Sequence, residues 1–330
     1  MKSYFESLEQ LRVENSKRTG LVALDLFAGC GGLALGFEAV GIDTIGYEQD
    51  ADAVKTYNKN LSGKCHQVTL TTETKFPAAD LIIGGPPCQP FSVGGNQNGL
   101  KDSRDGFPIF LNAVRTVKPK VFVFENVRGM LYRNKEYLSE IIESLERLGY
   151  SISFQLIKAV NYEVPQNRER LIVVGHLGGF EFPEALDYRF TAGDALSDIS
   201  HLVLPEHKFV TPSQDEYIAK YEKASKCITP RDLHMDKPSR TVTCRNLAGA
   251  TGDMLRIKLP DGRRKRLNVR EGARLQSFPD WFEFCGAESS QFKQVGNAVP
   301  PLMSYHIAKR IVAYLKGELS ESKKLQLEFF

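Results

Sequence analysis

Short apolar runs alternate with longer amphipathic segments over residues 1–177, and this alternation constrains the fold more than any other feature of the chain. The apolar runs cover 21–27, 43–48, 80–84, 120–124, 151–158 and 170–175. Segments with helical spacing of apolar residues lie at 33–40, 51–60, 106–117 and 135–148. Strands that alternate with helices form a sheet covered by helices on both faces. The pattern therefore predicts a doubly wound α/β domain with a mostly parallel sheet.

The regular alternation stops after Gly175. Two glycines, several prolines and short isolated strands follow, the strands at 239–244 and 254–259. We therefore expect a second, smaller and irregular domain over 178–285. An amphipathic helix at 299–315, preceded by the loop QVGNAVPP, is expected to pack back on the first domain. Residues 286–330 would then complete the domain formed by 1–177.

A basic hairpin is predicted inside the smaller domain. Asp261-Gly262 lies between apolar runs at 254–259 and 265–269, which is typical of a hairpin turn. The run RRKR follows this turn, and residues 201–275 hold 16 Lys and Arg against 9 Asp and Glu. Such clustering suits a polyanion, because phosphates need neighbouring positive charges. A charge run is more often a solvated loop, so both interpretations stay open.

The chain shows no signal for a membrane, an export pathway or a metal. No apolar run approaches the ~20 residues of a membrane span, and the N-terminal segment is highly charged. We expect a cytosolic protein with no membrane partner. The cysteines form no CxxC pair and have no histidine at ligand spacing, so neither zinc nor disulfides are expected. They are Cys30, Cys65, Cys88, Cys227, Cys244 and Cys285.

A glycine turn follows the first predicted strand, where open α/β sheets bind their ligands. In the sequence FAGCGG, Gly29 and Gly31 allow the backbone to approach a ligand closely, and the next helix begins there. Glu48 ends the second strand, at the position where a carboxylate binds ribose hydroxyls. The two features predict a nucleoside cofactor, although nicotinamide enzymes and plain tight turns share the glycine pattern.

Two further segments carry reactive side chains at strand ends. Cys88 lies in GGPPCQPFS, between a stiff Pro-Pro pair and a glycine-rich loop that suits a mobile lid. Glu125 ends the strand in FENV, where a buried carboxyl would be partly protonated and donate a proton, or else cap its own helix. Arg168 and Arg170 in QNRER are two residues apart, so one or both would hold Glu125 or a substrate oxygen, unless they form a surface charge pair.

Together these motifs closely resemble the cytosine-C5 DNA methyltransferase family. DLFAGCGG, GGPPCQPFS, FENV, QNRER and QVGNAVPP occur in the family's order between Leu21 and Lys309, and SRTVT and VREGARLQSFPDWF look like its later blocks. Residues of about 180–235 lack recognisable family sequence. The resemblance implies the fold of S-adenosylmethionine-dependent methyltransferases, with the smaller domain serving as a target-recognition domain.

The resemblance implies a covalent mechanism. Cys88 would attack carbon 6 of cytosine, which converts carbon 5 into a nucleophile. Glu125 would stabilise the ring at N3, and Arg168 and Arg170 would orient the base. Carbon 6 is inaccessible inside a stacked duplex, so the cytosine must be flipped out. The base that removes the proton from carbon 5 is not identified by the sequence.

The resemblance also implies a cofactor site and a DNA site. S-adenosylmethionine would be bound by Phe27, Ala28, Gly29, Cys30, Gly31, Gly32, Glu48, Gln49, Gln67, Val68, Pro87, Asn297 and Val299. Double-stranded DNA would be contacted by Gln89, Ser92, Arg240, Thr241, Thr243 and Arg245, with Arg231 and Arg256 as further candidates for contacts with bases. Gln67-Val68 stands where relatives often carry Asp-Ile, and Gln49 where an aromatic is sometimes found. Adenine is therefore expected to be held differently or less tightly.

Three other hypotheses remain at this point. One branch of the family methylates a tRNA cytosine with the same motifs. A catalytically inactive DNA-binding regulator is disfavoured by the presence of Cys88, Glu125, Arg168 and Arg170 together. A nicotinamide oxidoreductase is weaker still, because the turn lacks a full GxGxxG. The resemblance also implies a place in the bacterial cytosol or nucleoid and a separately acting restriction endonuclease as functional partner. Further expectations are a monomeric state and a short target of about four to six base pairs.

Overall fold

The computed structural model describes residues 2–14, 18–87, 105–205, 207–224, 226, 231–249 and 252–318. Within these residues the largest element is a seven-stranded sheet in the order β3-β2-β1-β4-β5-β8-β6. The strands are β1 (Val22–Leu26), β2 (Asp43–Glu48), β3 (Lys64–Gln67), β4 (Leu81–Gly84), β5 (Val121–Val127), β6 (Ser151–Lys158) and β8 (Glu169–His176). All neighbours pair in parallel except at β8, which is antiparallel to both β5 and β6. The predicted mostly parallel α/β sheet is confirmed.

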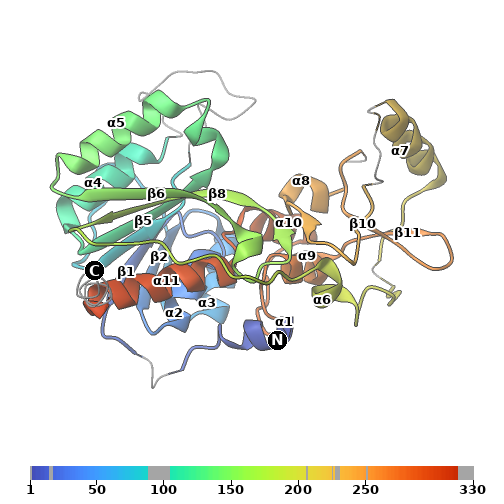
Figure 1. The fold of residues 1–330 in the computed structure, drawn as a ribbon, viewed down its shortest axis with the longest axis horizontal. Helices are drawn as coiled ribbons and strands as arrows, with labels where there is room; N and C mark the ends of the chain where they lie inside the picture. The colour runs from blue at the N-terminus through green and yellow to red at the C-terminus, as the bar shows by residue number, and fades with distance from the viewer. Residues whose placement is uncertain are drawn as a thin grey trace, which may run out of the picture.

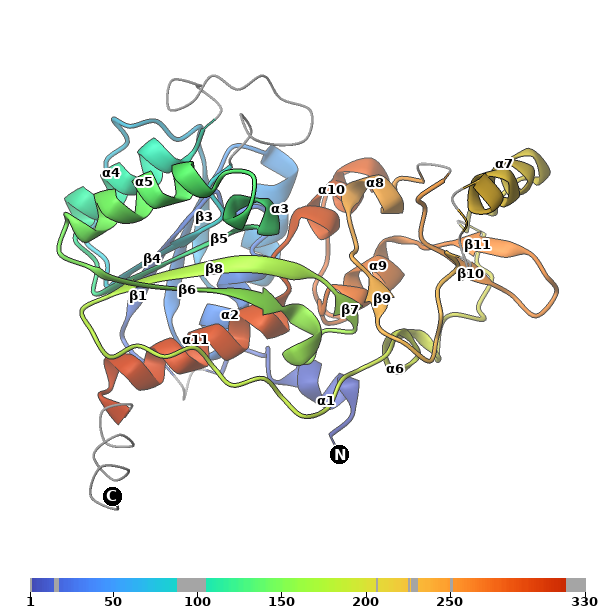
Figure 2. The same ribbon diagram turned by 45° about the horizontal axis from the view of Figure 1, so that its top comes forward.

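Helices cover both faces of this sheet (Figures 1 and 2). One face carries α4 (Phe107–Val117) and α5 (Lys135–Glu146), and the other carries α2 (Gly32–Ala39), α3 (Ala51–Asn60) and α11 (Pro301–Leu315). Neighbouring residues of β1 enter opposite cores: Ala23 packs on the α2 side and Leu24 on the α4 side. A strand that is buried on both faces needs a continuous apolar run, which is why these strands were recognisable in the sequence.

The second part of the molecule extends from one end of the sheet (Figure 1). It contains α6 (Ala192–Leu196), α7 (Pro212–Ala224), β9 (Ser239–Arg240), α8 (Cys244–Leu247), β10 (Arg256–Lys258), β11 (Arg264–Arg266) and α9 (Val269–Leu275). β10 and β11 pair antiparallel, which confirms the predicted hairpin. One apolar core runs from the sheet into this part and includes Ala23, Phe190 and Ala273. The division at 178 and 285 stays a proposal.

Ion pairs fix α7 to the hairpin. Arg256 is fully buried and contacts Asp232 at 2.5 Å and Glu222 of α7 at 3.0 Å. Arg264 contacts Asp232 at 3.0 Å and Asp215 of α7 at 2.7 Å. A buried charge is strongly disfavoured without such partners, so these pairs fix the position of α7.

Two predictions about local structure were wrong. The expected strand at 239–244 is a strand only over Ser239–Arg240, because Thr243 caps α8 through a hydrogen bond from Asn246 N at 3.2 Å. The expected loop QVGNAVPP begins inside α10 (Glu288–Asn297).

Among the described residues, no helix is both long and apolar enough to cross a membrane. The same part of the chain contains no group of three or more His, Cys, Asp or Glu arranged to hold a metal ion.

Candidate active site

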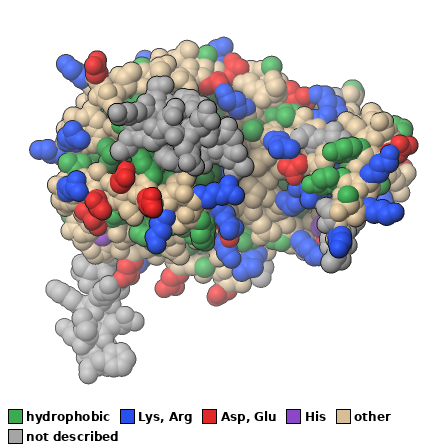
Figure 3. Space-filling model, turned by 90° about the horizontal axis from the view of Figure 1, so that it is seen from above, with side chains coloured by type: hydrophobic (Ala, Val, Ile, Leu, Met, Phe, Trp, Pro, Cys, Tyr) green, Lys and Arg blue, Asp and Glu red, His purple; other side chains and the backbone are tan. Residues whose placement is uncertain are grey.

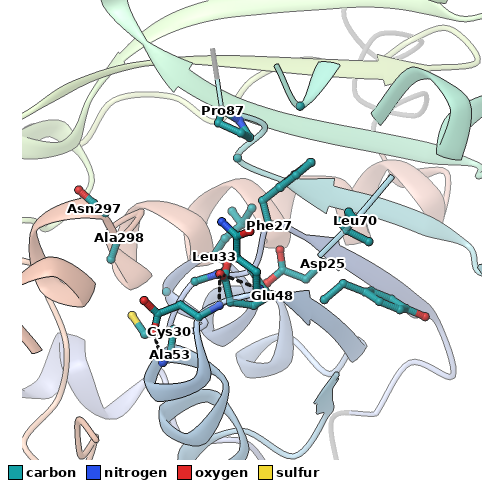
Figure 4. A pocket seen from close by; sticks show the side chains of 18 of the residues that line it. Asp25, Phe27, Cys30, Leu33, Glu48, Ala53, Leu70, Pro87, Asn297 and Ala298 are labelled. Atoms are coloured by element: carbon teal, nitrogen blue, oxygen red, sulfur yellow. Dashed lines mark hydrogen bonds between the residues drawn. The ribbon is translucent and has the colours of Figure 1, made fainter. Parts of the chain in front are cut away.

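A cavity of about 720 Å³ lies at the carboxyl ends of β1, β2 and β4. Figure 4 shows Asp25 and Phe27 from β1 and the turn after it, Glu48 from β2, and Asn297 and Ala298 from the end of α10 around this space. Every residue expected to bind the cofactor lines the cavity except Gly31 and Gln67. A carbon added at Gly31 would lie 2.9 Å from the ring of Tyr57, so Gly31 packs against α3 instead.

The turn between β1 and α2 is held by Glu48. The N–H of Gly29 donates to Glu48 Oε2 at 2.9 Å, and the N–H groups of Gln49 and Asp50 donate to Oε1 at 2.8 Å each. Phe27, Gly29 and Gly31 all have positive φ, of 58°, 55° and 90°. The positive φ of Phe27 costs conformational free energy, because a residue with a side chain disfavours this conformation. Backbone strain of this kind is concentrated at ligand sites.

Gly32 permits a close approach between distant parts of the chain. A Cβ at this position would lie 2.4 Å from the backbone oxygen of Val299. The loop after α10 therefore rests directly on the first turn of α2. This contact brings Asn297 and Val299 to the cavity although they lie more than 260 residues after Gly32 in the sequence.

Asp25 lines the cavity and was missed by the sequence analysis. It is 1% exposed, and neither carboxylate oxygen has a hydrogen-bond partner among the described residues. Burial, followed by the nearby carboxylates of Glu48 and Glu38, raises the pKa of Asp25 well above its usual range. An acid inside the apolar run LVALDLF was the available signal. A buried, unpaired carboxyl suits a cationic ligand, because a positive charge would stabilise its ionised form.

Cys30 is the described cysteine that faces the cavity, but its environment makes it a poor nucleophile. It is buried, and burial raises the pKa of its thiol to about 12. The thiolate, which is the reactive form, is therefore scarce at neutral pH. Cys88, Gln89 and Ser92 lie outside the described residues.

Glu125 and Arg170 form an ion pair at the edge of the same cavity. Arg170 Nε lies 2.7 Å from Glu125 Oε1, and both side chains are largely buried. The neighbouring Asn126 donates from Nδ2 to the backbone oxygen of Pro86 at 3.1 Å. This bond ties the end of β5 to the segment that leads to Cys88. Glu125, Pro87 and the cofactor turn thus border one space.

Arg168 is bound elsewhere. Its guanidinium donates to the backbone oxygens of Val242 at 2.8 Å and Ala298 at 3.0 Å, and more weakly to that of Gly296. Of the two arginines expected to serve Glu125, the structure pairs only Arg170 with it.

The predicted DNA residues have mixed surroundings. Arg240 pairs with Asp253 at 2.8 Å, Thr241 donates to the backbone oxygen of Asn167, and Arg245 is exposed. Thr243 caps α8. Arg256 was wrongly considered as a contact to bases, because it is buried between two carboxylates.

A second hollow of about 340 Å³ lies beyond Arg170. Its lining carries more positive than negative side chains, with Arg128, Lys158, Arg168, Glu169, Arg170 and Thr241 among its residues. Figure 3 shows Lys and Arg side chains on both parts of the molecule.

The fold and the cavity define a class. A sheet with one antiparallel strand, a glycine turn and a carboxylate after β2 suits an enzyme with a nucleoside cofactor. Entamoeba histolytica methyltransferase EhMeth shares this fold with a TM-score of 0.70 at 18% identity, over 89% of this chain and 98% of that one. Spodoptera frugiperda DNMT2 gives 0.69 at 14% identity, over 88% and 99%. The protein has the S-adenosylmethionine-dependent methyltransferase fold.

Sequence comparisons identify the family. The model of the C-5 cytosine-specific DNA methylases matches residues 21–313. Type II methyltransferase M.AplI of Arthrospira platensis is 56% identical over 96% of this chain and 93% of its own. M.FnuDI of Fusobacterium nucleatum is 34% identical over 92% and 97%. The chain belongs to the C-5 cytosine-specific DNA methylase family. It is a DNA cytosine-5 methyltransferase whose methyl donor is S-adenosylmethionine, and neither the tRNA enzyme nor the inactive regulator is favoured.

Proposed function

We propose that the enzyme methylates a flipped cytosine in a short duplex sequence through a covalent bond between Cys88 and carbon 6. The observation that carries this mechanism is the Glu125–Arg170 pair beside the cofactor cavity, bonded through Asn126 to the backbone just before Cys88. A nucleophile on this segment and an acid on β5 would face the same base.

Each residue then has a defined task. The Cys88 thiolate adds to carbon 6, and the electrons of the C5–C6 double bond shift through the ring toward N3. Glu125 donates a hydrogen bond or proton at N3, which stabilises that charge, while Arg170 holds the Glu125 side chain in place. Carbon 5, now nucleophilic, takes the methyl group that bound S-adenosylmethionine would supply, and S-adenosylhomocysteine is left as the product. After a base removes the proton from carbon 5, the sulfur leaves and the double bond forms again.

The cavity fits S-adenosylmethionine through its charges. Glu48 would accept from the ribose hydroxyls, and Asp25 would face the positively charged sulfonium. The first turn of α2 and the loop Asn297–Val299 would hold its carboxylate. Val68 and Leu70 border the cavity as an apolar wall for adenine. Gln67 stands where the family often carries an aspartate, so this wall lacks an acid at that position.

The smaller part of the molecule would read the target sequence, and the basic hollow beyond Arg170 would hold a phosphate next to the flipped base. One module of this size suits a target of about four to six base pairs.

We also propose that the enzyme acts as a monomer, since one chain supplies all these parts. The type II names of its relatives favour a cognate restriction endonuclease that acts separately.

Transfer of tritiated methyl from S-adenosylmethionine to duplex DNA and to tRNA tests the substrate, and bisulfite sequencing identifies the motif. Duplex DNA carrying 5-fluorocytosine in that motif tests the mechanism, because fluorine cannot leave as a proton does. We expect a complex of protein and DNA that survives denaturation, and its loss in Cys88→Ser. A stable complex in that variant would contradict the assigned nucleophile.

A further inference from the structure

Three buried polar side chains connect the two proposed binding sites. We call Gln166, Arg168 and Gln276 the bridging cluster; they are exposed by 0%, 1% and 0%. The proposed mechanism gives no task to Gln166 or Gln276, and Arg168 hydrogen-bonds to backbone oxygens rather than to Glu125. Fully buried amide and guanidinium groups are costly unless they are hydrogen-bonded, so their partners show what they hold in place.

The cluster holds the DNA side through Val242. Arg168 Nη1 donates to the backbone oxygen of Val242 at 2.8 Å, and Gln166 Oε1 accepts from its N–H at 3.0 Å. Both polar backbone groups of Val242 are thereby fixed. Val242 lies between Thr241 and Thr243, two of the residues expected to contact DNA.

The cluster holds the cofactor side through the end of α10. Arg168 Nη2 donates to the backbone oxygen of Ala298 at 3.0 Å, and Gln276 Nε2 donates to that of Val295 at 2.6 Å. These bonds act on both sides of Asn297, which lines the cavity. Gln166 Nε2 in turn donates to Gln276 Oε1 at 2.6 Å, and Arg168 is linked to Gln166 through the backbone of Val242, so the three side chains belong to one network.

Close packing leaves little freedom between the two sides. A Cβ at Gly296 of α10 would lie 2.0 Å from the backbone nitrogen of Cys244, the first residue of α8. The backbones of α10 and of residues 243–244 are therefore in direct contact. A shift on one side would be transmitted to the other, because packed interiors do not yield smoothly.

We propose that the bridging cluster couples cofactor binding to DNA binding. When S-adenosylmethionine binds against Asn297, it fixes the position of the end of α10. Through its hydrogen bonds the bridging cluster then also fixes the positions of Val242 and the neighbouring threonines. Arg168 and Gln276 are thus positioning residues. Coupling is reciprocal, so DNA increases the affinity for the cofactor by the same factor as the cofactor increases the affinity for DNA. The inference rests on the proposed roles of Thr241, Thr243 and Asn297.

A binding cycle tests the coupling without turnover. The Kd of sinefungin, which has no transferable methyl group, is measured with and without a duplex carrying the motif found by bisulfite sequencing, and the duplex Kd with and without sinefungin. We expect a coupling factor of about tenfold or more in the wild type, equal in both directions. In Arg168→Lys and Gln276→Leu it should fall to within about twofold of one.

Arg274→Lys is the matched control. Arg274 is also buried and lies two residues before Gln276, but its side chain pairs with Asp198 and Asp280 rather than with the cluster, so the coupling factor of this variant should stay at the wild-type value. A folded Arg168→Lys with undiminished coupling would overturn the proposal, as would a wild type that binds both ligands independently. If the wild type bound neither ligand, the proposed function would fail first. Two variants are used so that poor folding of one does not decide the result.

Discussion

Arg170 Nε lies 2.7 Å from Glu125 Oε1, and the two side chains are only 15% and 12% exposed. They come from neighbouring antiparallel strands, β8 and β5, where Arg170 is directly opposite Val127. The sheet therefore fixes both partners, and a substrate entering this site meets a carboxyl group whose position does not depend on a loop.

Glu125→Gln should lower kcat about 10²- to 10⁴-fold, because an amide cannot deliver a proton to N3. Binding of duplex DNA should change much less. Single-turnover methyl transfer measures the loss. Glu181→Gln, which removes an exposed pair with Arg310, is the control and should keep full activity. An unchanged kcat in Glu125→Gln would remove Glu125 from the mechanism.

Asp25→Asn should weaken the binding of S-adenosylmethionine by about tenfold or more. The binding of S-adenosylhomocysteine should weaken less, since only the methyl donor carries a sulfonium charge. Because the pKa of Asp25 is raised in the free enzyme, a cationic ligand must favour its ionised form. Wild-type affinity should accordingly increase with pH, and the variant should lose this dependence. Calorimetry with both ligands gives the answer. Equal losses for the two ligands would contradict a contact with the sulfonium, and Asp52→Asn, outside the cavity lining, is the control.

Cys30 should resist alkylation in the folded enzyme, because burial raises its pKa to about 12. Iodoacetamide at pH 8 followed by peptide mass spectrometry should show modification of Cys88 but not of Cys30. Unfolding in urea should make Cys30 react. Rapid native-state modification of Cys30 would show that the turn opens far more often than the structure implies.

Glu163 should make stability depend on acid pH. Burial alone would raise its pKa, but hydrogen bonds from His306, Tyr188 and Ser7 outweigh this and lower the pKa to about 2. The contribution is therefore complete above the unfolded pKa of about 4.3 and is lost as pH falls from about 5 to 2. It should amount to roughly 2–3 kcal/mol. Urea unfolding of wild type and Glu163→Gln across this range should give curves that converge at low pH; parallel curves would contradict the assignment.

Gly32→Ala should destabilise the protein by about 1–3 kcal/mol and weaken cofactor binding, since the added carbon meets the Val299 backbone oxygen. Thermal melting with and without S-adenosylhomocysteine measures both effects. In Gly129→Ala the added carbon has its nearest neighbour at 3.9 Å, so this variant should melt close to the wild type. Equal melting of the two variants would mean that the α10 loop moves away easily.

The sequence predicted the sheet well because its strands are buried on both faces and read as apolar runs. It failed at 239–244, where the β-branched Thr241, Val242 and Thr243 favour a strand in isolation. There the capping bonds of Thr243 and contact with α10 decide the conformation instead. Propensity describes single segments, and these constraints come from residues far along the chain.

The site was predictable as a set of residues but not as a set of contacts. Glycines and an acid after strands located the cavity. Nothing in QNRER shows that Arg170 pairs with Glu125 while Arg168 bonds to backbone oxygens, because those oxygens belong to segments more than 70 residues away. Asp25 was missed because a single acid within an apolar run does not by itself indicate a binding site.

The ion pairs of Arg256 and Arg264 with α7 set a rule for exchanging target specificity between relatives. A graft limited to the hairpin would leave the α7 acids Asp215 and Glu222 without their cations, and one limited to α7 would leave the buried Arg256 and the partly buried Arg264 with Asp232 as their remaining partner. The smallest transferable unit is therefore the stretch 212–266, moved whole. Evolution of a new target by point changes is then confined to side chains outside these pairs.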